Sequence, residues 1–226
     1  MKKLAIIPAR EGSKGISKKN LHELAEKPLI AWSIEAALKS KLLVAIVVSS
    51  DNKEILEFSK QYEKLTCIDR PDDLAKDLSS TEPVIRHVLD ELSADDIYEY
   101  LVLLQPTSPL RTTNDIDDAI RTIKDSDATS LISVIQPEHH PLKSFVKDEK
   151  GHLKGLVNNQ FPFMPRQELP ETYQPNGAIY IVEVKEFLKN NKLFTDKTIA
   201  YIMSSNKSID VDSLDDVKKI ENQLKT

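Results

Sequence analysis

The sequence predicts a doubly wound α/β fold with a mostly parallel sheet. In the first two-thirds of the chain, short β-branched runs alternate with helix-like stretches at the length of β-α-β units. One run, 42–50, is almost continuously apolar, as a parallel strand covered on both faces must be. Unusual polar residues follow the strands, and such sheets bind ligands beyond the carboxyl ends of their strands. We therefore expect a ligand site at that edge.

The individual elements follow from apolar patterning along the chain. LAIIP forms the first strand, and a polar loop leads to a helix over 28–40 whose apolar residues fall on one face. The same reasoning predicts further strands at 42–50, 65–68, 100–104 and 130–135, and further helices at 52–63, 81–92 and 113–126. The last part of the chain is expected to form strands at 178–184, 198–203 and 208–211 and helices at 184–190 and 213–225.

Composition changes between 137 and 175, where six of the twelve prolines lie. Proline fixes φ and removes a hydrogen-bond donor, so this stretch is expected to form turns and short or edge strands that project from the core. Projections of this kind often mediate dimerisation. The sequence thus predicts one domain over 1–226, with 137–175 as a projecting dimerisation segment.

Charge and hydropathy exclude several classes of partner. A net charge of −5 disfavours a general nucleic-acid binder, although one basic pocket for a small anion remains possible. The sequence has no apolar run of membrane-spanning length and no signal-peptide pattern at its start. We expect a cytoplasmic protein that binds neither nucleic acid nor a membrane, with Cys67 as a core residue of a strand.

The loop PAREGSKGISKKN (8–20) follows the first strand and combines two of the chain's five glycines with four cations. Glycines let backbone N–H groups approach an anion, and cations offset phosphate charge, so the loop suggests a triphosphate site. It matches neither a Walker A loop nor a GxGxxG fingerprint. The alternative is a solvated basic loop with turn glycines.

Two further segments carry chemistry. In QPTSPLR (105–111), prolines stiffen a loop that can hold Gln105, Ser108 and Arg111 in place for a ligand, the alternative being a structural turn. In SIDVD (208–212), Asp210 and Asp212 point to the same side of a strand-like run, which suits a divalent cation such as Mg²⁺ bound together with phosphates. The alternative is a strand edge before a helix capped by Ser213.

The two ends of the proline-rich segment hold further polar residues. Lys143 and Arg166 are candidates for holding a carboxylate substrate, because an arginine suits bidentate binding. Adjacent His139 and His140 lack the spacing of a zinc site. Gly177, in the PNGA turn, is expected to adopt positive φ or to leave room for a ligand.

Taken together, IIPAREGSKGISKKN, RPDDLAKD, LLQPTSPLR, EHHPLK, YQPNGAIYI and SIDVDSLDD closely resemble the CMP-acylneuraminate cytidylyltransferases, from residue 4 to about 220. The resemblance implies a Rossmann-like fold and a Mg²⁺-dependent reaction of CTP with a nonulosonic acid, an α-keto acid sugar, that releases pyrophosphate. In that reaction the anomeric hydroxyl of the sugar attacks the α-phosphate of CTP. The order and spacing of the motifs together are far more specific than any one of them.

The resemblance also implies roles for individual residues. Catalysis and phosphate neutralisation would fall to Arg10, Lys19, Asp210 and Asp212, the last two holding the Mg²⁺. The nucleotide would contact Pro8, Ala9, Arg10, Gly12, Ser13, Gly15, Asn20, Arg70, Ser80 and Thr81. The sugar would contact Gln105, Lys143, Arg166, Asn176 and Gly177. Lys143 and Arg166 would reach the partner's active site, so a homodimer with shared sites is expected.

One position departs from the family pattern. Several sialic acid enzymes have arginine where this chain has Gln174, so a contact with the sugar is expected to differ. Neuraminate, legionaminate and pseudaminate remain open as substrates, with the first two favoured. The alternatives are a cytidylyltransferase for the eight-carbon keto acid KDO and a non-catalytic nucleotide or sugar sensor on the same fold.

Overall fold

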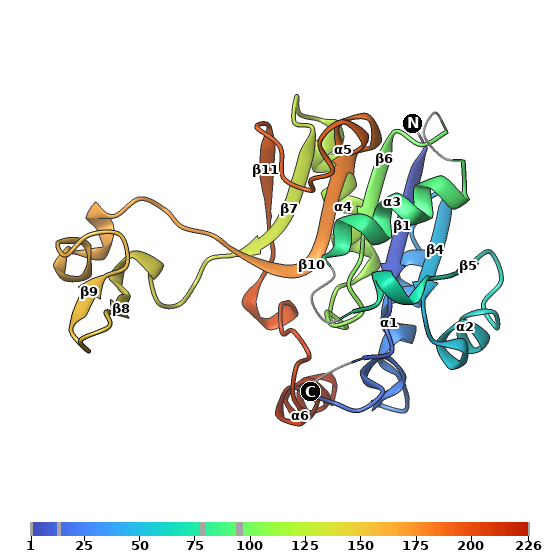
Figure 1. Cartoon of the computed structure of the whole chain (residues 1–226), viewed down its shortest axis with the longest axis horizontal. Coiled ribbons are helices and arrows are strands. Elements are labelled where there is room, and N and C mark those ends of the chain that lie inside the picture. Colours follow the sequence, from blue (N-terminus) through green and yellow to red (C-terminus); the bar gives the residue numbers. More distant parts are fainter. Residues whose placement is uncertain (1, 13–14, 77–79, 94–96, 226) are drawn as a thin grey trace.

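A computed structural model describes residues 2–12, 15–76, 80–93 and 97–225 (Figure 1). Within these residues, the central sheet has seven strands in the order β11-β7-β10-β6-β1-β4-β5. Neighbouring strands run parallel except around β10, which is antiparallel to both β6 and β7. The predicted mostly parallel sheet is thus confirmed. Its strands are β1 Lys3–Pro8, β4 Ala45–Ser50, β5 Thr66–Asp69, β6 Tyr100–Leu103, β7 Ser130–Ile135, β10 Gln174–Glu183 and β11 Thr198–Ile202.

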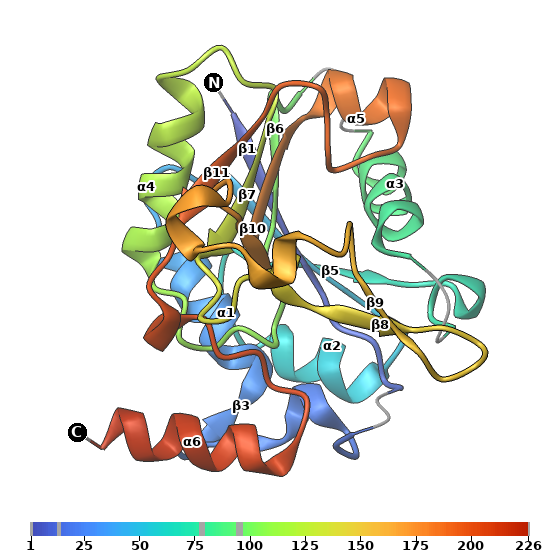
Figure 2. The same cartoon turned by 90° about the vertical axis from the view of Figure 1, so that its left-hand side faces the viewer.

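Helices cover both faces of this sheet (Figure 2). They are α1 Leu29–Leu38, α2 Lys53–Ser59, α3 Thr81–Glu91, α4 Thr113–Lys124 and α5 Val184–Asn190. A sixth helix, α6 Leu214–Leu224, lies beyond the end of the sheet. Each of these lies at a position predicted from the sequence. Local capping fixes some of the starts: the Asn52 side chain accepts a hydrogen bond from the Ile55 amide, and Thr112 with Asp115 forms a capping box before α4.

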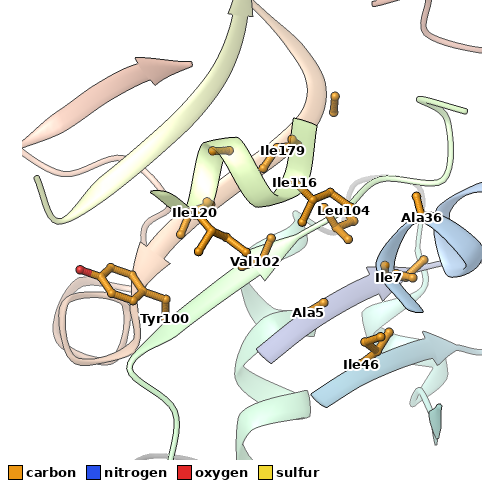
Figure 3. Packing of buried hydrophobic residues seen from close by; sticks show 14 of the residues in the cluster. Ala5, Ile7, Ala36, Ile46, Tyr100, Val102, Leu104, Ile116, Ile120 and Ile179 are labelled. Carbon is orange, nitrogen blue, oxygen red and sulfur yellow. The ribbon is translucent and has the colours of Figure 1, made fainter. Parts of the chain in front are cut away.

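Alternate residues of the central strands pack into two separate cores. Ala5 and Ile7 of β1 face the core that includes residues of α1 and α4, where Ile116 and Ile120 also lie (Figure 3). Leu4 and Ile6 point the other way, into the core formed with α3 and α5. Since both faces are covered, the strands are continuously apolar, which is the pattern that the sequence shows.

Three local features differ from the sequence prediction. The run 42–50 is a strand only from Ala45, because Leu42 and Leu43 pack against the core from the preceding turn. A short hairpin, β2 Glu23–Leu24 with β3 Lys27–Pro28, precedes α1 and is absent from the predicted elements. Its two turn residues, Ala25 and Glu26, have positive φ without the usual Asn-Gly signal.

The third difference concerns 208–211, which is not a strand. This segment follows a short 3-10 turn, Ser205–Lys207, and leads into α6, whose capping box joins Ser213 and Asp216 as expected for the predicted cap. Val211 is buried against Val217 and Ile220 of α6 in a third, smaller apolar cluster. The segment is therefore held by packing and by loop contacts in place of a strand ladder.

Residues 136–173 extend away from the sheet between β7 and β10 (Figure 1). They contain a small antiparallel pair, β8 Phe145–Lys147 with β9 Leu153–Gly155, and several 3-10 turns. Several large apolar side chains of this segment are exposed, Phe163 by 80%. No helix in the described ranges is long and apolar enough to cross a membrane.

Candidate active site

A pocket of about 550 Å³ lies beyond the carboxyl ends of the parallel strands. Pro8 ends β1, Arg70 follows β5, and Gln105 follows β6, so their side chains meet at one edge of the sheet. The predicted site residues that line it are Pro8, Arg10, Gly12, Gly15, Lys19, Asn20, Arg70, Ser80, Thr81, Gln105, Asp210 and Asp212. Segments up to about 200 residues apart in the chain thus converge on one pocket, as the motifs predict.

Hydrogen bonds shape the loop that follows β1. The Asn20 side chain is 8% exposed and donates from Nδ2 to the Arg10 carbonyl at 2.9 Å, which closes the loop on itself. The Glu11 amide donates to Asp51 Oδ1 at 3.0 Å. Lys18 forms an exposed ion pair with Glu54 of α2 at 2.7 Å and does not line the pocket. Of the loop's lysines in the described residues, Lys19 is the one in the pocket wall.

Lys19 connects this loop to the acidic segment. Its Nζ donates to the Val211 carbonyl at 2.9 Å and to Asp212 Oδ1 at 3.0 Å. Lys19 is also close enough to Asp210 to influence that carboxylate electrostatically. The cation therefore faces both members of the acidic pair, from a side chain that is itself only 16% exposed.

The acidic pair lies on an irregular segment, not on the predicted strand, yet both carboxylates reach the pocket. The segment is fixed because the Val211 amide donates to the Thr107 carbonyl at 2.9 Å. Burial of the Asp210 carboxylate in the pocket wall raises its pKa, even though the residue is exposed as a whole, and the Asp212 charge raises it further. Hydrogen bonding from Thr107 and the charge of Lys19 oppose this shift without cancelling it.

These carboxylates fit a hard divalent cation. A desolvated carboxylate beside a second one is stabilised when a cation sits between them, and Mg²⁺ characteristically takes one or two carboxylates together with substrate phosphates. The described residues contain no group of three or more His, Cys, Asp or Glu side chains that could hold a metal by themselves. Asp210 and Asp212 would thus bind the ion with ligand phosphates completing its shell.

Two arginines, Arg10 and Arg70, also line the pocket. Arg70 is 5% exposed and donates to the Ser49 carbonyl at 2.6 Å and to Ser49 Oγ at 3.3 Å. Burial lowers the pKa of Arg70, the charge of Asp51 opposes this shift, and the like charge of Arg10 adds to it. Two guanidinium groups close enough to repel each other in a partly buried pocket favour an anionic ligand.

Five pocket residues were missed by sequence reasoning: Leu74, Lys76, Val84, Pro106 and Thr107. Leu74 and Lys76 lie inside RPDDLAKD, and Pro106 and Thr107 belong to QPTSPLR, so four of the five residues fall within motifs that the sequence analysis singled out. Leu74 and Val84 are apolar wall residues, which resemble core residues in a sequence.

Five of the other predicted residues do not line this pocket, and Ser13 lies outside the described residues. Ala9 is fully buried and its amide donates to the Ser49 carbonyl at 2.9 Å. Lys143 and Arg166 lie on the projecting segment. There Arg166 borders a separate cavity of about 280 Å³ and donates to the Pro137 carbonyl at 3.3 Å.

Asn176, also predicted at the site, is 8% exposed and uses its amide inside the fold. Its Nδ2 donates to Ser208 Oγ at 2.8 Å, and its Oδ1 accepts from Ser133 Oγ at 2.6 Å. Gly177 has φ of +76° and lies directly behind Gln105, since a Cβ at Gly177 would be 2.7 Å from Gln105 Oε1. The expected positive φ of Gly177 is confirmed, and the space beside this glycine is occupied by the Gln105 side chain.

Known proteins resemble this chain over almost its full length. A family model described as cytidylyltransferase matches residues 4–223. CMP-N,N'-diacetyllegionaminic acid synthase from Legionella pneumophila is 37% identical over 94% of this chain and 92% of that protein. Pseudaminic acid cytidylyltransferase from Campylobacter jejuni is 30% identical over 96% of this chain and 94% of that protein.

Other relatives are longer. N-acylneuraminate cytidylyltransferase from Streptococcus agalactiae is 34% identical over 96% of this chain, but the chain spans only 52% of that protein. Among solved structures, CMP:2-keto-3-deoxy-manno-octonic acid synthetase complexed with CTP has a TM-score of 0.74 at 15% identity, over 100% of this chain and 99% of that one. This last likeness shows the fold alone. With the family match covering both the sheet and the pocket, the chain belongs to the cytidylyltransferase family.

Proposed function

We propose that this protein transfers CMP from CTP to the anomeric hydroxyl of a nonulosonic acid and releases pyrophosphate. The observation that carries the proposal is the convergence of a glycine-containing basic loop, two arginines and an acidic pair on one pocket. This combination of charges matches a triphosphate with a bound cation. The names of the three relatives described above, two cytidylyltransferases and a CMP-sugar synthase, support the same chemistry.

The chain's own residues would bind and orient the reactants. Arg10, Lys19 and Arg70 would offset the charge of the triphosphate, and backbone N–H groups near Gly12 and Gly15 would approach its oxygens. Ser80 and Thr81, at the start of α3, would help to recognise the cytidine. Catalysis in such transfers comes mostly from positioning and from stabilising charge on the leaving group.

The bonds exchanged in the reaction follow from the substrates. A bond forms between the anomeric oxygen and the α-phosphorus, the bond to the β-phosphate oxygen breaks, and the hydroxyl proton passes to a carboxylate or to water. Asp210 and Asp212 would hold Mg²⁺, which would supply positive charge against the negative charge that develops as pyrophosphate departs.

On the acceptor side, Gln105 would touch the sugar. Lys143 and Arg166 would act in the active site of a partner subunit, because neither lines the pocket of its own chain. The projecting segment supports such a dimer: Leu153, Val157 and Phe163 are exposed by 64%, 61% and 80%, and exposed apolar side chains on one small segment mark an interaction site.

Complementation between two inactive variants tests this arrangement. Arg10→Ala would inactivate a chain's own pocket, whereas Arg166→Ala would inactivate the pocket of its partner. Mixing the two variants should restore part of the activity, because one pocket in a mixed dimer retains both residues. An active monomer in size-exclusion chromatography with light scattering would contradict the shared site.

A pyrophosphate-release assay with CTP, Mg²⁺ and a panel of acceptors tests the function itself. The panel contains neuraminate, legionaminate, pseudaminate and KDO, and release with one of the first three supports the proposal. Release with KDO alone would identify the eight-carbon enzyme, whose solved counterpart shares this fold. No release with any acceptor, together with tight binding of CTP, would identify a sensor. The reaction is proposed to take place in the cytoplasm, which supplies CTP.

A further inference from the structure

Arg111 is a buried cation behind the active site. It is 2% exposed, and no carboxylate in the described part of the chain forms a salt bridge with it. Burial lowers its pKa to about 9, which still leaves the side chain charged at neutral pH. A guanidinium buried without an ion-pair partner costs stability unless its N–H groups are satisfied by other acceptors.

The acceptors of the two Nη groups of Arg111 come from three different elements, whereas its buried Nε has no hydrogen-bond partner among the described residues. Nη1 donates to the Gln105 carbonyl at 3.0 Å and to the Ala178 carbonyl at 2.8 Å. Nη2 donates to Ser33 Oγ of α1, and Ser33 Oγ in turn lies 3.4 Å from the same Gln105 carbonyl. Arg111 therefore joins the loop after β6, the strand β10 and the helix α1 at one point.

The two carbonyls belong to segments that form one wall of the site. Gln105 lines the pocket, and Gly177, next to Ala178, lies against the Gln105 side chain, where a Cβ would be 2.7 Å from Oε1. β10 is irregular here, since its register against β7 shifts between Pro175 and Tyr180. Because the regular ladder is interrupted, other groups must fix the position of Ala178.

We propose that Arg111 is a positioning residue, which holds Gln105 against Gly177 and thereby sets the acceptor-side wall of the pocket. It touches no substrate, and it acts through the backbone of the two segments that it joins. This inference rests on the proposed function only where it names the acceptor as the affected substrate. The structural part, that Arg111 fixes the two segments, stands without it.

Arginine is the side chain that this junction requires. Its planar guanidinium presents several donors in fixed directions, so it can serve two carbonyls and a hydroxyl at once. A lysine keeps the charge but has a single flexible ammonium and cannot hold all three acceptors in one geometry. The conservative variant Arg111→Lys therefore separates fixed positioning from simple charge.

The first experiment is hydrogen exchange by mass spectrometry on the full chain. Arg111→Lys should increase amide exchange in peptides covering 105–111 and 174–180 and leave peptides of α3 unchanged. Arg86→Lys is the matched control, because Arg86 also joins separate elements, donating to the Leu188 carbonyl at 2.9 Å, but does not line the pocket. It should alter exchange around α3 and α5 only.

The second experiment is steady-state kinetics on the same variants. With Arg111→Lys, kcat/KM for the acceptor should fall by about 100-fold, the loss expected from a displacement of about 1 Å, while KM for CTP stays within about twofold. Arg86→Lys should leave kcat/KM for the acceptor and KM for CTP unchanged. The inference would be overturned if Arg111→Lys lowered kcat/KM equally for CTP and for the acceptor. It would also be overturned if amide exchange in peptides 105–111 and 174–180 did not change.

The two experiments also separate this inference from the proposed function. If the wild type fails to release pyrophosphate with every acceptor tested, the proposed function is wrong. Hydrogen exchange alone then decides whether Arg111 fixes the two segments. If Arg111→Lys does not fold, Ser33→Ala removes one of the three acceptors without changing charge. It should give a smaller change of the same pattern, and no change in either segment would again overturn the inference.

Discussion

Gly15 lies against the backbone of Asp212, such that a Cβ on Gly15 would come within 2.0 Å of the Asp212 carbonyl oxygen. Real Cβ atoms do not approach an oxygen this closely, so any larger residue at 15 must displace one of the two segments. A hydrogen bond connects the same two segments, since Lys19 Nζ donates to the carbonyl of Val211, 192 positions further along the chain. The glycine-containing loop and the acidic segment thus form one unit of the pocket.

Gly15→Ala should weaken CTP binding. Displacement of the acidic segment would misplace both carboxylates, and we expect the Kd for CTP with Mg²⁺ to rise about tenfold, or ~1.4 kcal/mol. Isothermal titration calorimetry measures it. Gly155→Ala is a matched control, because a Cβ there would come within 1.9 Å of the Asn158 carbonyl oxygen on the projecting segment. Equal loss of CTP affinity in both variants would contradict the prediction.

Asp210→Asn should raise thermal stability while it abolishes activity. The pKa of Asp210 is raised in the folded state, mainly by burial, so the folded protein holds this proton more tightly than the unfolded chain. The free energy of unfolding therefore falls as pH rises from the ordinary value of 3.8 to the folded pKa, and the penalty persists at neutral pH. Asparagine cannot ionise, so it removes the penalty.

Melting curves of both proteins between about pH 4 and about pH 8 measure this effect as a widening gap in Tm with rising pH. The rate of pyrophosphate release should fall by at least about 100-fold, as for loss of a group that stabilises developing charge. Asp212→Asn is the control: it also loses activity, but it breaks the ion pair with Lys19 and should not raise Tm. A variant with lower Tm at neutral pH would refute the assignment for Asp210.

The order of elements and most of the pocket could be predicted from the sequence. Continuous apolar runs identify the parallel strands because both faces of the sheet are covered, and the motif loops converge because the carboxyl ends of those strands share one edge. The pattern SIDV indicates a strand since Ile209 and Val211 alternate with polar residues. In the structure, the Val211 side chain packs against α6, and its amide donates a hydrogen bond to the Thr107 carbonyl. Tertiary contacts of this kind cannot be recognised from the local sequence pattern.

The hairpin before α1 and the environment of Asn176 could not be predicted for related reasons. Ala25 and Glu26 adopt positive φ although neither residue type favours it, so the turn is imposed by what surrounds it. Asn176 sits beside a turn glycine, which suggests a ligand contact. Its amide is instead occupied by Ser133 and Ser208, and this is visible only when β7 and the segment before α6 are placed in space.

Asn176→Ala should destabilise the protein more than it affects sugar binding. It removes the acceptor of the buried Ser133 hydroxyl and of the Ala178 amide, together with the bond to Ser208, which costs about 1–3 kcal/mol. For a chain of this size, Tm should fall by about 2–4 °C per kcal/mol. Asn190→Ala, an exposed amide at the end of α5, should leave Tm unchanged. An unaltered Tm with a raised KM for the acceptor would instead identify Asn176 as a direct sugar contact.

Gly177→Ala should have two separate effects, a loss of stability from backbone strain and impaired use of the acceptor from the contact with Gln105. The residue has φ of +76°, which costs an alanine about 1–3 kcal/mol, and its Cβ would lie 2.7 Å from Gln105 Oε1, so the glutamine must move. Gly151→Ala isolates the first effect, because Gly151 has φ of +85° and no atom within 4 Å of an added Cβ. Both variants should lose stability to a similar degree, but only Gly177→Ala should raise KM for the acceptor, by about tenfold. Similar KM values for the two variants would mean that the contact between Gly177 and Gln105 has no part in acceptor binding.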